Sequence, residues 1–123
     1  MDLKLVFRIA AVIAAINGLG LLFMTTTFFE MANLTISADL ITAGQFIGVT
    51  FFFLALLQWR IPDIAGDAFS SLGQLFAIGH AMWFLIVGFH IMTGQAGGAT
   101  AYANIAVIAI LGILFFMKSR STE

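Results

Sequence analysis

Four long apolar runs constrain this chain more than any other feature. Together they contain a single charged residue, Arg8, and the third, residues 70–92, contains none. At a helical rise of ~1.5 Å per residue, about 20 residues cross a ~30 Å hydrocarbon layer. The runs therefore predict one transmembrane domain over residues 1–123, with helices at about 5–24, 40–59, 70–92 and 101–117.

The composition indicates a membrane protein. The chain is 62% hydrophobic and 9% charged, whereas soluble domains are about 25% charged. Short connections place neighbouring helices antiparallel. We therefore predict an all-α integral membrane protein, an up-down bundle of four transmembrane helices. The net charge of −1 argues against nucleic acid as a partner. Because the chain has no cysteine, it has no disulfide and no thiolate metal site.

The basic residues predict the orientation in the membrane. With four crossings, all five fall on one side of the bilayer: Lys4, Arg8, Arg60, Lys118 and Arg120. Loops rich in Lys and Arg stay in the cytoplasm. We therefore expect both termini and the central connection to be cytoplasmic.

Small residues mark the expected helix contacts. Helices in lipid associate by close backbone approach, so glycines gather where they touch. Gly44 and Gly48 form a GxxxG pattern, Gly18 follows alanines at four-residue spacing, and Gly112 lies in the last run. These glycines are either seams within the bundle or seams to a partner chain, and the pattern fits both.

Polar side chains inside the runs form a layer. At ~1.5 Å per residue, Asn17, Gln45 and His80 lie at comparable depth, slightly outside the bilayer midplane. Steps of about 100° put His80 on one helix face with aromatic side chains. The predicted ligand-binding set is His80, Trp83, Phe76, Phe84, Asn17 and Gln45.

His80 supports three interpretations. It is a neutral histidine hydrogen-bonded to Asn17 or Gln45, a contact to a ligand or cofactor, or a proton relay; titratable groups at this depth are often functional. His90 lies ten residues on, so both imidazoles cannot serve one metal from the same helix. The identity of any cofactor or metal stays open.

The sequence offers little for catalysis. No predicted span holds an acid, and no nucleophile–base pair or cysteine is present. We therefore predict a non-enzymatic protein, a small structural or accessory subunit of a homo-oligomer or larger membrane complex. Its partners are membrane lipids and other membrane chains or copies of itself. One alternative is a binder of a lipid, quinone or pigment at the His80 face. Another is a small transporter or channel.

One stretch carries a family resemblance. Residues 44–63, GQFIGVTFFFLALLQWRIPD, are followed by a third helix, a glycine-rich turn leading to Tyr102 and Asn104, and a short last helix. From about Ser37 onward this pattern resembles small four-helix bacterial membrane proteins of the DoxX-like and domain-of-unknown-function group. The resemblance implies a bacterial cytoplasmic (inner) membrane and brings no catalytic residues.

Overall fold

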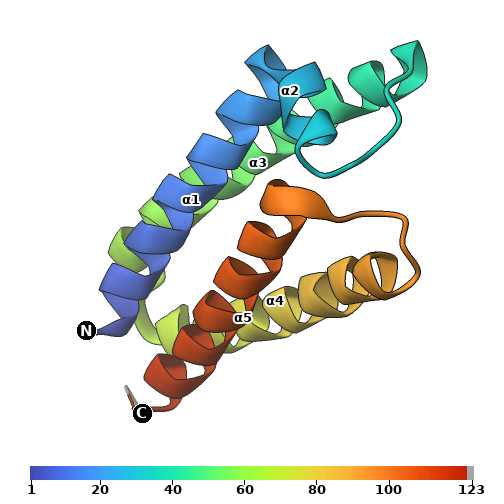
Figure 1. Cartoon of the computed structure of the whole chain (residues 1–123). Coiled ribbons are helices and arrows are strands. Elements are labelled where there is room, and N and C mark those ends of the chain that lie inside the picture. The colour runs from blue at the N-terminus through green and yellow to red at the C-terminus, as the bar shows by residue number, and fades with distance from the viewer. Residues whose placement is uncertain (122–123) are drawn as a thin grey trace.

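The computed structural model describes residues 1–121 and confirms the predicted fold class. Four of its helices are long and apolar enough to cross a membrane, and they pack as a bundle (Figure 1). These residues contain no strand. The elements in chain order are α1 (Leu3–Phe23), α2 (Thr25–Glu30), α3 (Ala38–Ile64), the 3-10 turn η1 (Gly66–Ala68), α4 (Phe69–Met92) and α5 (Gly98–Ser121).

Two helices begin at side-chain caps. Asp2 accepts a hydrogen bond from the backbone N–H of Leu5 at 2.9 Å, and Ser37 accepts one from Leu40 at 3.1 Å. Such caps satisfy amide groups that have no partner within the helix. They start α1 and α3 two residues before the predicted spans.

The terminal part of α3 differs from the expected linker at residues 60–67. The helix continues to Ile64 and includes Pro62 in its last turns. Proline removes one helical hydrogen bond, and close to a helix end little of the ladder is lost. At the start of α4 the cap residue is Ala68, and no side chain caps this end, although the acidic Asp67 directly precedes it.

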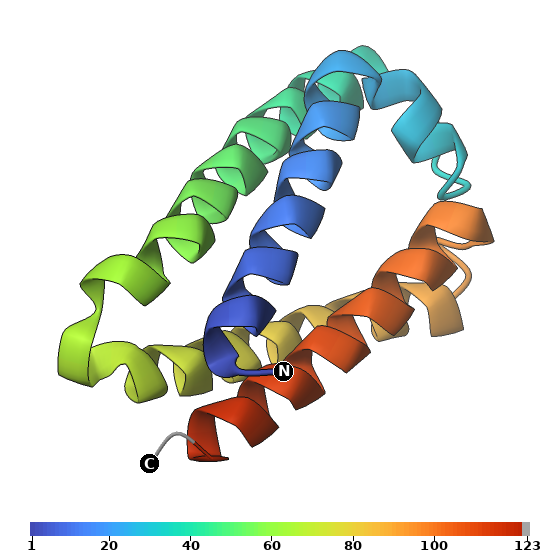
Figure 2. The same cartoon turned by 90° about the vertical axis from the view of Figure 1, so that its left-hand side faces the viewer.

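Figures 1 and 2 show both chain ends of the described part and the α3–α4 turn at one end of the molecule. We call this the terminal end, and the other the distal end. At the terminal end, Arg8 donates from Nη2 to both carboxylate oxygens of Asp63, at 2.9 and 3.0 Å. Its guanidinium lies 4.3 Å from the ring centroid of Trp59. This cluster joins the start of α1 to the last turns of α3.

The helices form two antiparallel pairs. α1 packs along α3, and α4 packs along α5, whereas α3 and α4 diverge from their shared turn (Figure 2). A Cβ atom on Gly18 would lie 3.0 Å from the backbone oxygen of Gly48, so these two glycines bring α1 and α3 together. On Gly112, a Cβ would lie 3.1 Å from the Cβ of His80. The structure thus places these glycines at seams between helices of the same chain.

A cluster of buried apolar side chains joins the two pairs near the terminal end. The ring of Phe7 in α1 meets Phe115 of α5 at a centroid distance of 4.9 Å and Phe76 of α4 at 5.1 Å, both edge to face. Such ring pairs add stabilisation beyond their buried area. This core cluster consists of Leu3, Val6, Phe7, Ala10, Ile61, Leu111 and Phe115.

The short helix α2 covers the distal end and was not expected from the sequence. Its Phe29 packs against Gly44 of α3, where a Cβ atom would lie 2.5 Å from the ring. The following segment is tied to the start of α5, because the N–H of Gly97, just before α5, donates to the Ala32 carbonyl at 2.9 Å, and the N–H of Thr100 donates to the Met31 carbonyl at 3.2 Å. The distal ends of the two helix pairs are therefore connected.

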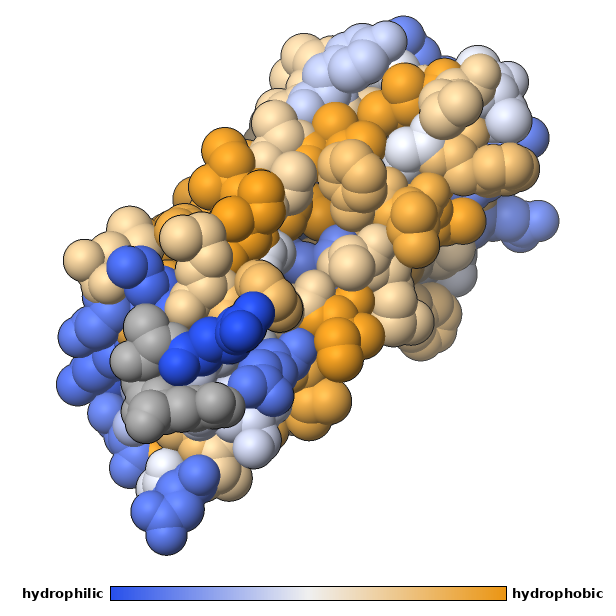
Figure 3. Space-filling view, turned by 90° about the horizontal axis from the view of Figure 1, so that it is seen from below, coloured by the Kyte–Doolittle hydropathy of each residue, from blue (hydrophilic) through white to orange (hydrophobic). Residues whose placement is uncertain are grey.

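Hydrophilic residues gather at the ends of the molecule. Figure 3, which looks from below, shows them at the lower left of the view and again at the far end, with an apolar stretch between. Large apolar side chains are exposed along this stretch, as expected for a surface that meets lipid tails.

Candidate functional site

A cavity of about 480 Å³ lies between the two helix pairs and is the candidate functional site. Side chains from all five α-helices line it, and most of them are apolar. No Asp, Glu, Lys or Arg is present among the described residues of its lining. Its polar side chains come from α1, α3, α4 and α5: Asn17, Gln58, His80, Thr100 and Asn104. Pockets for apolar ligands have this composition, with a few polar groups that fix orientation.

Gln58 is the most deeply buried polar side chain of this cavity. It is 2% exposed, and its Oε1 has no hydrogen-bond partner among the described residues. It lies six residues before the end of α3 at Ile64, so ~9 Å inside the helix end. Its backbone carbonyl also lacks the usual helical donor, because Pro62 follows four residues later. Gln58 is thus an acceptor held in an apolar setting.

His80 is held by its own helix. Its Nδ1 lies 2.7 Å from the carbonyl oxygen of Phe76, and its ring stacks obliquely on Phe115 at 5.2 Å. A carbonyl only accepts, so Nδ1 carries the proton and, in the neutral ring, Nε2 is an acceptor. The hydrogen bond from His80 to Asn17 or Gln45, one of the three interpretations, is not formed among the described residues, where the imidazole pairs with Phe76 instead.

The structure brings four of the six predicted ligand-binding residues to the central cavity: Asn17, Phe76, His80 and Trp83. Gln45 is exposed on α3 and does not line the cavity. Phe84 lies on the other side of α4. Sequence reasoning did not assign Gln58 to the site, although it follows Gly44 by fourteen residues and so shares its helix face within ~40°. Asn104 and Phe51 also line the cavity and were not assigned to it.

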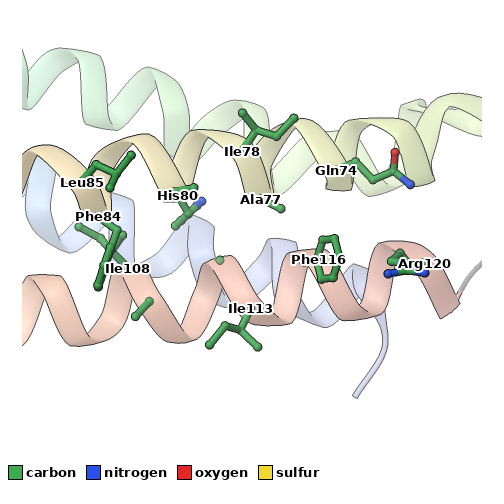
Figure 4. A pocket seen from close by; sticks show the side chains of 13 residues that line it. Gln74, Ala77, Ile78, His80, Phe84, Leu85, Ile108, Ile113, Phe116 and Arg120 are labelled. Atoms are coloured by element: carbon green, nitrogen blue, oxygen red, sulfur yellow. The ribbon is translucent and has the colours of Figure 1, made fainter.

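A second hollow of about 850 Å³ runs along the outside of α4 and α5 (Figure 4). Phe84 and Ile113 contribute to its apolar walls, and Arg120 lies at its terminal end. The guanidinium of Arg120 is 5.1 Å from the ring centroid of Phe116. This outer groove follows the lipid-facing surface, and His80 lines both it and the central cavity.

The central cavity opens between α3 and α4. Ile47 and Leu75 line it and are nonetheless 41% and 60% exposed, so they stand at its rim. Between the diverging helices, the rings of Phe51 and Trp83 touch at a centroid distance of 5.8 Å. We call this opening, bordered by Ile47, Leu75, Phe51 and Trp83, the lateral portal.

The two ends of the cavity are covered. The core cluster fills the space towards the terminal end, where its members Leu111 and Ala10 also line the cavity. Towards the distal end, Phe28 and Phe29 of α2 line it, and the residues that follow α2 are hydrogen-bonded to the start of α5. Access from the bilayer through the lateral portal is therefore more direct than access along the membrane normal.

The side chains that line the cavity determine whether it can hold a metal, catalyse a reaction or only bind a ligand. Within residues 1–121, no three His, Cys, Asp or Glu side chains come together as a metal site. The cavity offers hydrogen-bond donors and acceptors and apolar contacts, which suit binding. Comparison with protein-family models, with curated proteins and with solved structures finds no match. The DoxX-like resemblance therefore stays a prediction.

Proposed function

We propose that this membrane protein binds an uncharged, lipid-soluble molecule in the central cavity. The observation that carries the proposal is Gln58, whose buried Oε1 lines the cavity without a hydrogen-bond partner in the described residues. An unpaired buried polar group costs ~1–3 kcal/mol. A bound molecule that forms a hydrogen bond with this amide removes the free-energy cost of the unpaired oxygen, which accounts for a buried glutamine at this position.

Water is a poorer occupant of this cavity. One water takes up ~30 Å³ and needs two to four polar partners, whereas the cavity measures about 480 Å³ and is mostly apolar. The polar side chains are also spread along it, from Gln58 near the terminal end to Thr100 in the first turn of α5. These features favour a molecule with a long apolar body.

The covered ends favour binding over conduction. A channel or transporter needs a wet path along the membrane normal, and the core cluster with Phe7 and Phe115 lies across that direction. The lateral portal instead faces the lipid. We therefore favour a site that exchanges its ligand with the bilayer.

A role as an accessory subunit is the second candidate. The observation that favours it is α4, in which Gly73 is the one buried residue. Such an exposed helix can be covered by lipid, by a second copy or by another membrane chain. Gentle extraction followed by native mass measurement tests this. A lone monomer that captures no membrane partner would count against this role and leave ligand binding unaffected.

We also propose a location and an orientation. The DoxX-like resemblance points to a bacterial cytoplasmic membrane. The five basic residues all lie towards the terminal end, which supports a cytoplasmic position for both chain termini and the α3–α4 turn.

The binding proposal is tested by extraction of the natively purified protein. We expect its organic extract to contain a neutral molecule beyond bulk phospholipid, identified by mass spectrometry. Gln58→Met keeps the length of the side chain and removes its hydrogen bonds, and it should reduce the recovered molecule about tenfold. Gln45→Met changes an exposed residue of the same type on the same helix and serves as the matched control.

Circular dichroism shows whether each variant keeps its helices. An extract of the native protein that contains bulk phospholipid alone would refute the proposal. Equal recovery from the native protein and from Gln58→Met would remove Gln58 from the site.

A further inference from the structure

We infer that the molecule in the central cavity is a neutral lipid alcohol, whose hydroxyl group donates a hydrogen bond to Oε1 of Gln58. This inference rests on the proposed function and adds the chemical class of the ligand. It follows from three properties of the cavity: its charge, the hydrogen-bonding group that it leaves unpaired, and its length.

The cavity excludes a charged head group. Its described lining contains neither acid nor base. An ion buried without a counter-charge loses its hydration and gains no compensating ion pair. Fatty acids, amines and phosphate-bearing lipids would each bring such a charge next to Gln58. The polar end of the ligand is therefore uncharged.

The unpaired group at the cavity wall is an acceptor. Gln58 Oε1 is buried and receives no hydrogen bond from the described residues. His80 adds a second acceptor at the wall, Nε2 in the neutral ring, because Nδ1 donates to Phe76. A hydroxyl group supplies the missing donor. Ethers, esters and ketones present only acceptors and leave Gln58 unsatisfied.

The length of the cavity favours an extended ligand. Its lining on α3 runs from Ile47 to Gln58, and on α5 from Thr100 to Leu111. Both stretches correspond to ~16 Å at the helical rise. With about 480 Å³ over this length, the space is long and narrow. A single aliphatic or isoprenoid chain fits it, with the hydroxyl group near Gln58 and the chain towards α2.

The experiment compares two probes that differ in the donor alone, 1-dodecanol and its methyl ether. Trp83 lines the cavity, and the chain has two tryptophans. Trp59→Phe keeps an aromatic ring beside Arg8 and leaves Trp83 as the single fluorescent reporter. Each probe is titrated into this variant in lipid nanodiscs, and the dissociation constants are compared.

We expect the alcohol to bind about tenfold more tightly than the ether, the size of effect that an unpaired buried acceptor produces. In the added variant Gln58→Met this preference should fall below about twofold, and in Gln45→Met it should persist. Circular dichroism confirms that the variants are folded.

Each other outcome overturns the inference. Equal binding of both probes refutes the alcohol and leaves the proposed function intact. Tighter binding of the ether means that the amide presents its NH₂ group to the ligand. Equal loss of both probes in Gln58→Met means that Gln58 acts through packing alone. If neither probe changes the fluorescence of Trp83 or binds to the protein, the proposed function fails as well.

Discussion

The indole of Trp83 in α4 lies against the ring of Phe51 in α3, with centroids 5.8 Å apart and planes inclined by 36°. The two residues are 32 positions apart in the chain, and their helices otherwise diverge (Figure 2). Both side chains line the central cavity, and Trp83 is 44% exposed. The contact therefore spans the lateral portal, through which a ligand from the bilayer would pass.

We predict that fixing this contact slows ligand exchange. The chain has no cysteine, so Phe51→Cys with Trp83→Cys can be bridged by a short bifunctional thiol reagent without side reactions. The bridge holds α3 and α4 together across the portal. Release of preloaded radiolabelled 1-dodecanol should become at least about tenfold slower, a barrier increase of ~1.4 kcal/mol.

The control for this bridge lies away from the portal. Ser70 donates to the backbone oxygen of Ser119 at 2.6 Å, between α4 and α5 at the terminal end. Bridging Ser70→Cys with Ser119→Cys should leave the release rate unchanged. If both bridged proteins release the probe as fast as the native protein, the ligand leaves by another route.

The pair of Arg8 and Asp63 predicts a loss of stability on mutation. The Arg8 side chain is 19% exposed, and its Nε is buried without a partner among the described residues. Asp63→Asn removes the charge that compensates the guanidinium. The cost lies between that of an exposed pair and that of a buried pair, about 1–2 kcal/mol.

Unfolding in mixed detergent micelles, followed by circular dichroism, measures this difference. Asp67→Asn is the matched control, because Asp67 is exposed in the neighbouring turn η1. Its effect should stay within about 0.5 kcal/mol. Equal effects of the two variants would show that the ion pair contributes nothing specific.

The fold could be predicted largely from the four apolar runs. In lipid, a long apolar segment forms a helix because its backbone N–H and C=O groups must pair within the segment. The short helix α2 could not. Its six residues contain three threonines, which are poor helix formers. Its position depends on tertiary contacts instead, chiefly that of Phe29 with Gly44. Sequence periodicity carries no signal for such a contact.

The site was less predictable than the fold. The second span was expected to end at Trp59, which would place Gln58 at the membrane surface. A polar side chain is common there, so Gln58 gave no signal of a site. The continuation of α3 to Ile64 moves it into the interior. His80, Phe76 and Trp83 were expected on one helix face, and all three line the cavity, but the bond of His80 to Phe76 depends on a side-chain rotamer that helical spacing leaves open. The helix face of these three residues could be read from the spacing, whereas the hydrogen-bond partner of His80 could not.

The contact of Gly18 with Gly48 predicts a strong effect of one added methyl group. A Cβ on Gly48 would lie 3.0 Å from the backbone nitrogen of Leu22 and 3.1 Å from the Gly18 oxygen. Backbone atoms cannot move aside as a flexible side chain can. Gly48→Ala should therefore lower the unfolding free energy by about 1–3 kcal/mol.

Gly88→Ala provides the comparison for this variant. There the nearest atom to a Cβ is Ile105 Cδ1 at 3.5 Å, an ordinary contact. We expect a change of less than about 0.5 kcal/mol in the same micelle assay. If Gly48→Ala is equally mild, α1 and α3 can separate without cost, and the glycine seam is not what holds them.

The orientation in the membrane yields a prediction that needs no ligand. Thr35 is exposed in the segment between α2 and α3 at the distal end, and Asp67 is exposed in η1 at the terminal end. Because the basic residues lie towards the terminal end, Asp67 should face the cytoplasm and Thr35 the outside. In the cysteine-free chain, Thr35→Cys should react with a membrane-impermeant maleimide on intact cells. Asp67→Cys should react only after lysis. If Asp67→Cys is labelled on intact cells and Thr35→Cys is protected, the orientation is the reverse of the one proposed. If both are labelled on intact cells, the two exposed turns do not lie on opposite sides of the membrane.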